Sequence, residues 1–329
     1  MTRFFGFLLI PLLVLGACGD DTTPVKNDGK VTQKDGGADS APPPTGLDCT
    51  TATNCKSYVF NKLILPADSA QTQKFAIDFD KDGTPDNQLG AILSALAGAT
   101  QGLALQDSVD AAMNQGTTII LLKVQGGDFS NAPKAAAQAW IGQKAECCPT
   151  DKTDPVKCAA EAATTCFKGS FEFTKDPVSP SDALFGGAIT GGEGTFGPAK
   201  LTITLPLTDA GAITVALQKA QFKVTFAGDK ITGGVLAGGI TEDDLNKQVI
   251  PGVAKLMDNT VQDPGTSTST KDQILQFFDA DKDGKITEAE VKANALISAF
   301  LAGDVDVDGD GTLELSLGVG FEAVGAVIK

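Results

Sequence analysis

The sequence predicts an α+β fold, in which a curved antiparallel β-sheet packs on a few helices and a helix-loop-helix lies near the C-terminus. From residue 169 onward, apolar residues alternate with polar ones, a period typical of antiparallel strands with one face on a core and the other on water. Pairs of glycines interrupt this pattern and predict turns and bends between the strands. These pairs are Gly186-Gly187, Gly191-Gly192 and Gly233-Gly234.

Alternation and helical spacing locate the individual elements. The segments with period-two alternation are residues 171–173, 201–207, 213–217, 222–226 and 313–321. Small and apolar residues three and four apart predict helices at residues 89–99 and 109–113, and the apolar run at residues 117–124 predicts a buried strand. Thr241 precedes three acidic residues, so it is expected to cap a helix that Pro251 kinks or splits.

The N-terminus has the layout of an export signal. Arg3 precedes an apolar run at residues 4–15, which is shorter than the roughly 20 residues needed to span a bilayer. Residues 1–17 are therefore predicted to be a signal peptide. The segment Leu15-Gly16-Ala17-Cys18 resembles the lipobox of bacterial lipoproteins, which implies that Cys18 is lipidated and anchors the protein to a membrane. The alternative is an ordinary signal peptide with a chance cysteine.

Composition divides the rest of the chain. Residues 18–47 are predicted to be the lipidated cysteine and a disordered tether, because they are almost free of apolar residues and include three consecutive prolines. Residues 48–265 are predicted to form a β-rich α+β domain. After a second tether at residues 262–270, residues 266–329 form a C-terminal region whose last strand is expected to join the main sheet.

Cysteines and charge indicate the compartment and the partners. The cysteines beyond Cys18 are Cys49, Cys55, Cys147, Cys148, Cys158 and Cys166. An even number in an exported chain predicts disulfides. Cys49 is expected to pair with Cys55. The adjacent Cys147 and Cys148 are expected to bond to Cys158 and Cys166 in an order left open, with a zinc site from these four as the alternative.

The formal net charge is −15, and the only arginine, Arg3, lies in the signal peptide. Without arginine forks or a positive field, the chain is not expected to bind nucleic acid, and divalent cations are the favoured partners. It has no histidine, the usual general base near neutral pH, and no nucleophile elbow or phosphate loop. The chain is predicted not to be an enzyme. Its single Trp140 and single Tyr58 are expected to pack in the core or at its edge, and not to form a platform for a ligand.

Residues 279–290 match the EF-hand calcium loop position by position. The expected ligands at positions 1, 3, 5, 7, 9 and 12 are Asp279, Asp281, Asp283, the Lys285 carbonyl, Thr287 and Glu290. Gly284 falls at position 6, where the loop turns sharply. Helices predicted at residues 271–278 and 288–301 flank the loop, so the helix-loop-helix is predicted to be EF-hand-like and to bind Ca²⁺. A solvated acidic turn is the alternative.

Two further acidic loops resemble each other, since residues 78–90 align without gaps on residues 306–318. Their expected calcium ligands are Asp78, Asp80, Asp82, Thr84 and Asp86 in one, and Asp306, Asp308, Asp310, Thr312 and Glu314 in the other. Both have leucine, Leu89 or Leu317, at position 12, where an EF-hand has its clamping glutamate. Either a carboxylate from elsewhere completes each site, or these loops bind calcium more weakly than residues 279–290. In the loop at residues 306–318, Asp304 could take the first ligand position and shift the register by two residues. For both loops, the alternative is an Asp-Gly turn that binds no ion.

Several segments resemble a largely uncharacterised group of cell-envelope lipoproteins from myxobacteria and their relatives. They are residues 56–63, 78–90, 243–246 and 315–319, together with the EF-hand-like loop. The resemblance implies secretion and calcium binding but no activity. The expected function is that of a calcium-binding, lipid-anchored structural or interaction protein of the bacterial envelope, on the outer membrane rather than the inner. The alternative is a carrier of an apolar, lipid-like ligand, held in a cavity lined by the alternating residues.

Overall fold

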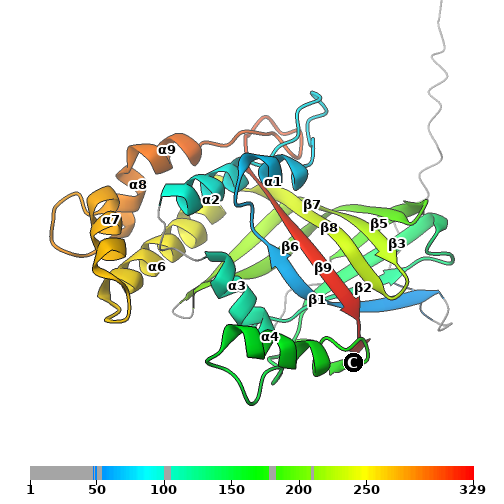
Figure 1. The fold of residues 1–329 in the computed structure, drawn as a ribbon. Coiled ribbons are helices and arrows are strands. Elements are labelled where there is room, and N and C mark those ends of the chain that lie inside the picture. The colour runs from blue at the N-terminus through cyan, green and yellow to red at the C-terminus, as the bar shows by residue number, and fades with distance from the viewer. Residues whose placement is uncertain (1–46, 48, 50–53, 100–104, 178–182, 209–210) are drawn as a thin grey trace, which may run out of the picture. The chain divides into compact units, whose positions relative to one another are not determined.

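The computed structural model describes residues 47, 49, 54–99, 105–177, 183–208 and 211–329. Within them, eight antiparallel strands close into a barrel (Figure 1). In order around the barrel, these are β1 (Cys55–Ile64), β2 (Ile120–Gln125), β3 (Asn131–Ile141), β5 (Leu184–Thr190), β6 (Glu193–Thr208), β7 (Gly211–Ala227), β8 (Lys230–Ile240) and β9 (Leu315–Gly325). The predicted signal peptide and Cys18 lie outside the described residues.

The predicted open, curved sheet packed on helices is wrong, because the last strand closes the sheet on itself. β9 pairs with β8 on one side, with Leu317 opposite Gly238, and with β1 on the other, with Phe321 opposite Leu63. Alternation along each strand shows that one face is buried, but it does not show which strands pair. Closure depends on a pairing between β1 and β9, which are separated by most of the chain.

Two of the glycine pairs predicted to form turns lie inside strands instead. Gly187 is in β5 and Gly234 is in β8, whereas Gly191-Gly192 does form the β5–β6 turn with positive φ at both residues. A Cβ on Gly234 would lie 2.5 Å from the ring of Phe321, its partner on β9. The strand glycines therefore leave room for large side chains of neighbouring strands, a use of glycine that strand propensity does not predict.

Aromatic rings fill the barrel interior. The largest side chains buried there are Tyr58, Phe60, Phe185, Phe196, Phe222 and Phe321. The rings of Phe60 and Phe321 stack with centroids 4.0 Å apart, and Phe185 meets Phe222 edge-on at 4.9 Å. These contacts make the interior a packed core. Tyr58 belongs to this core, as expected from the sequence.

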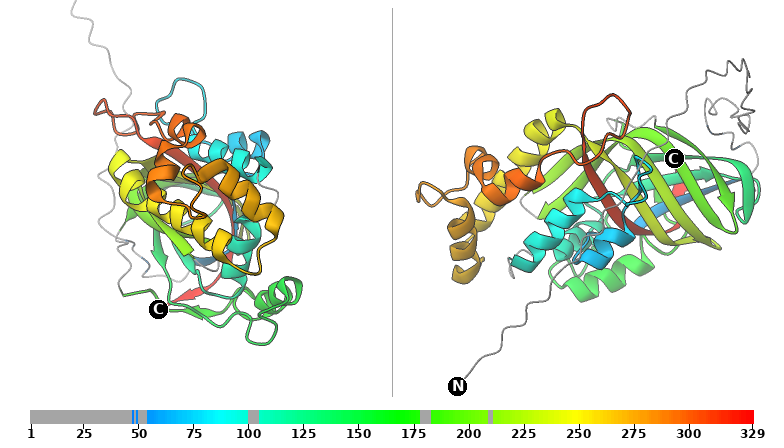
Figure 2. Two further views of the ribbon diagram at one scale, coloured as in Figure 1. Left: turned by 90° about the vertical axis from the view of Figure 1, so that its left-hand side faces the viewer. Right: turned by 90° about the horizontal axis from the view of Figure 1, so that it is seen from above.

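Helices extend the core at one end of the barrel (Figures 1 and 2). Those that contribute buried side chains include α2 (Gln88–Ala99), α3 (Leu105–Asn114), α6 (Ile250–Gln262) and α7 (Thr268–Phe278). The short α1 (Ser69–Lys74) instead lies outside β9, where Phe75 packs against Gly320. None of the described helices is both long enough and apolar enough to cross a bilayer.

A smaller cluster lies against the outer wall of the barrel. It joins Val59, Leu121 and Trp140 to Cys147, Cys166 and helix α4 (Pro155–Thr164). Nearby, β4 (Glu172–Phe173) and β10 (Val327–Ile328) form a two-stranded parallel sheet. The disulfides are Cys49–Cys55, Cys147–Cys166 and Cys148–Cys158. The pairing expected for Cys49 is therefore present, and the order left open by the sequence is resolved.

The segment between β8 and β9 corrects the prediction of a C-terminal EF-hand-like module. After the predicted Thr241 cap come α5 (Glu242–Asp244), a π-helical turn η1 (Leu245–Val249) and α6, so the helix is split next to Pro251. Only a short turn separates α6 from α7. The exit helix expected at residues 288–301 is broken into α8 (Glu288–Ala293) and α9 (Ala295–Phe300), because Asn294 is extended and its side chain accepts a hydrogen bond from the Ile297 amide.

Candidate metal sites

In the described part of the chain, three clusters of carboxylates each bring their oxygens within 4.8 Å of one another. They lie in what we call the first acidic loop (residues 78–86), the second (residues 279–290) and the third (residues 306–314). The cluster members are Asp78, Asp80 and Asp86; Asp279, Asp281 and Glu290; and Asp306, Asp308 and Glu314. Each predicted loop therefore gathers some of its predicted ligands at one point.

The three loops share one backbone conformation. Their fourth and sixth residues all have positive φ: Lys81 and Gly83, Lys282 and Gly284, and Gly309 and Gly311. Residues other than glycine rarely adopt this region. The same two left-handed bends thus recur where the loops carry the same spacing of aspartates.

The loops also share their internal hydrogen bonds. The first aspartate accepts from the amide of the glycine at position 6 in every loop: Gly83 to Asp78 at 3.1 Å, Gly284 to Asp279 at 2.9 Å and Gly311 to Asp306 at 2.9 Å. The aspartate at position 5 accepts from the residue at position 7: Thr84 to Asp82, Lys285 to Asp283 and Thr312 to Asp310. These bonds hold the aspartate side chains inward over the loop.

In each loop, the last carboxylate side chain folds back on the start of the loop, and we call it the closing carboxylate. It accepts a hydrogen bond from the amide at position 2: Phe79 to Asp86 at 2.8 Å, Ala280 to Glu290 at 2.8 Å, and Val307 to Glu314 at 3.0 Å. Asp86 and Glu314 stand at position 9, whereas Glu290 stands at position 12. Asp86 and Glu314 therefore close the first and third loops by hydrogen bonding, and Leu89 and Leu317 at position 12 are core residues.

The segment that follows each loop explains the two positions of the closing carboxylate. In the first and third loops, the closing residue forms an isolated antiparallel β-bridge with the residue just before the loop. These bridges pair Ile77 with Asp86 and Val305 with Glu314, so the chain returns to the start of the loop nine residues later. The second loop instead ends in α8. There Glu290 is the third helical residue, and its side chain accepts from the Thr287 amide in a capping box. Thr287 thus acts as a helix cap in this structure.

The closing carboxylates differ in their electrostatics. Burial raises the pKa of Glu314, and the charges of Asp308, Asp310 and Asp306 raise it further against the hydrogen bond from Val307. Burial likewise raises the pKa of Asp86, with Asp80, Asp304 and Asp78 adding to it. Burial also opposes ionisation of Glu290, but hydrogen bonds from Thr287 and Ala280 outweigh it and lower its pKa. A bound cation would relieve the repulsion in the first and third loops.

The first and third loops are joined through buried polar side chains. The Asn87 side chain donates to the Gly318 carbonyl at 3.0 Å and accepts from the Gly318 amide at 2.7 Å. The Ser316 hydroxyl accepts from the Gln88 amide at 2.7 Å and donates to Asp304. Asn87 is 6 % exposed and Ser316 is fully buried. Asp304 therefore links the two loops through Ser316, a contact that sequence reasoning missed, and the ligand register that would begin at Asp304 stays a prediction.

No family model matches this chain, and neither a curated protein nor a solved structure matches it. The chain's own fold and its three acidic loops are therefore the features that indicate its function.

Proposed function

We propose that this protein is a calcium-binding β-barrel of the bacterial cell envelope, with a structural or interaction role and no catalysis of its own. The observation that carries the proposal is the threefold repetition of one loop. The same bends, the same aspartate spacing and a closing carboxylate that accepts from the amide at position 2 recur in all three loops. The packed barrel interior favours a structural role over that of a lipid carrier.

The donor set favours calcium over other ions. Every clustered donor is a carboxylate oxygen, which suits hard cations, whereas zinc and copper sites use nitrogen and sulfur. The six cysteines of the folded part are joined in disulfides. Loops of several carboxylates and carbonyls fit the six to eight ligands of calcium better than the octahedral shell of magnesium, which keeps much of its water.

Neutralising one closing carboxylate should remove one calcium ion from the protein. Asp86→Asn, Glu290→Gln and Glu314→Gln are each expected to weaken one site at least about tenfold, since even residues that only support metal ligands contribute about 10- to 100-fold. Isothermal titration calorimetry should then count two tight ions in each variant and three in the unaltered protein.

The matched control is Glu288→Gln, which neutralises an exposed glutamate at position 10 of the second loop that belongs to no cluster. It should leave all three ions in place. Loss of an ion in this control, or three unchanged ions in the closing-carboxylate variants, would contradict the proposed sites.

The envelope location rests on the N-terminal sequence. We expect Cys18→Ser to move the protein from the membrane fraction to the soluble fraction of its own cells, because the variant has no thiol to acylate. The folded part should keep the same melting temperature, since the predicted tether separates it from the anchor. Immunoblots of fractionated cells measure the shift, and a variant that still sediments with membranes speaks against a lipid anchor.

A further inference from the structure

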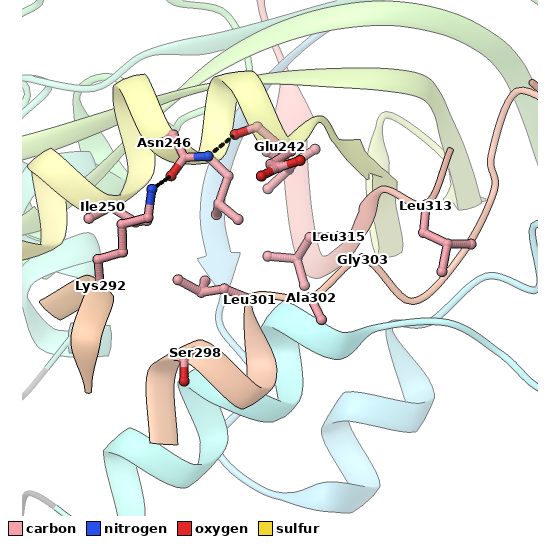
Figure 3. Close-up of a pocket in the computed structure, with 12 residues that line it drawn as sticks. Glu242, Asn246, Ile250, Lys292, Ser298, Leu301, Ala302, Gly303, Leu313 and Leu315 are labelled. Atoms are coloured by element: carbon pink, nitrogen blue, oxygen red, sulfur yellow. Dashed lines mark hydrogen bonds between the residues drawn. The ribbon is translucent and has the colours of Figure 1, made fainter. Parts of the chain in front are cut away.

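A pocket of about 370 Å³ lies between the end of β8, η1 and the segment that leads from α9 to β9 (Figure 3). Its volume is in the range of about 300–1,000 Å³ typical of small-molecule sites. None of the clustered carboxylates lines it. The acidic loops therefore do not account for this pocket.

One wall of the pocket is aliphatic. It is formed by Ile240, Leu245, Ile250, Leu301, Leu313 and Leu315, and no aromatic side chain of the described residues lines it. Leu313 is 54 % exposed, which is unusual for a large apolar side chain in this protein. An aliphatic group bound here would cover Leu313, whereas a flat ring would find no stacking partner.

The opposite rim carries one negative and one positive side chain. The Asn246 amide donates to the Glu242 carbonyl at 2.9 Å and accepts from the Lys292 ammonium at 2.7 Å. Figure 3 shows Asn246 held between these two residues. In the described part of the chain neither Glu242 nor Lys292 forms an ion pair. The pocket lining thus includes, beside its aliphatic side chains, a carboxylate without an ion pair and an ammonium group with further donors.

We propose that this pocket binds a small aliphatic zwitterion of the amino-acid type, such as leucine. The ligand's carboxylate accepts hydrogen bonds from Lys292, its ammonium group donates to Glu242, and its side chain packs against the leucine wall. Binding needs all three features, because a carboxylate alone faces Glu242 and an amine alone faces Lys292.

Leucine and three analogues test the proposal by nuclear magnetic resonance titration of the calcium-loaded protein. 4-Methylpentanoate lacks the ammonium group, 3-methylbutylamine lacks the carboxylate, and glycine lacks the aliphatic side chain. Leucine should shift the amide signals of the pocket residues, and each analogue should bind about tenfold or more weakly. Failure of leucine to shift these signals, or equal binding of any analogue, overturns the proposal.

Two variants assign the polar contacts. Lys292→Met should weaken leucine about tenfold and abolish its advantage over 3-methylbutylamine, while Glu242→Gln should abolish its advantage over 4-methylpentanoate. Both side chains are exposed, so the fold should be retained. The control Lys255→Met removes an exposed lysine on α6 outside the pocket and should bind leucine unchanged. Unchanged leucine binding by Lys292→Met overturns the assignment.

Discussion

Removal of calcium by a chelator is expected to lower the melting temperature of the whole barrel. An ion that binds only the folded state stabilises it by about 2.7 kcal/mol per site at a hundredfold excess over its Kd. At about 2–4 °C per kcal/mol for a domain of this size, each site accounts for roughly 5–10 °C. Because Asn87 and Ser316 connect the first and third loops to β9, the shift should appear in one transition.

Differential scanning calorimetry with calcium and with a chelator measures this shift. Magnesium added after chelation is the control, and it should restore less of the stability than calcium does. Identical melting curves with and without calcium would mean that the loops are acidic turns, which contradicts the proposed function.

The substitution Asn87→Ala should destabilise the protein more than any single loop variant. It leaves the amide and the carbonyl of Gly318 without their side-chain partner in a buried position. Each unsatisfied buried group costs about 1–3 kcal/mol, so the loss of both partners should lower the free energy of unfolding by about 2–6 kcal/mol. Calcium affinity should fall at both the first and the third loops, because Asn87 positions the exits of both.

Chemical denaturation at saturating calcium measures the loss in Asn87→Ala. Asn114→Ala, at the end of α3, is the matched control, because in the described structure this side chain does not bond to a buried backbone group. This substitution should change the free energy of unfolding little. Equal stabilities of the two variants would show that the buried amide does not join the loops.

The three carboxylate clusters could be predicted from the sequence, because the members of each lie within a dozen consecutive residues. Aspartate spacing and one glycine specify such a loop without reference to the rest of the fold. The alignment of the first and third loops also indicated which residues are their closing carboxylates. Both loops have a carboxylate at position 9, Asp86 or Glu314, and neither has one at position 12. In an EF-hand the closing carboxylate stands at position 12, whereas these two loops form an isolated bridge at position 9, after which the first continues into α2 and the third into β9.

The barrel could not be predicted in the same way, because its determinants are distant pairings and small residues. β3 is rich in alanine, and β5 and β8 are rich in glycine, so the branched and aromatic residues typical of strands are diluted in all three. In β5 and β8, Gly187 and Gly234 leave room for the rings of Phe196 and Phe321 on neighbouring strands. The link between Asn87 and Gly318 likewise joins residues 231 positions apart, which no local pattern reveals.

The position of β9 also governs how the chain acquires its structure during synthesis. β1 is among the first strands made, yet its partner β9 comes last, after all the helices between β8 and β9. Until residues 315–325 have emerged from the ribosome, β1 and β8 each present an unpaired edge. Such edges can pair with strands of other chains. A chain interrupted before residue 315 is therefore prone to aggregate, even though it contains seven of the eight described barrel strands.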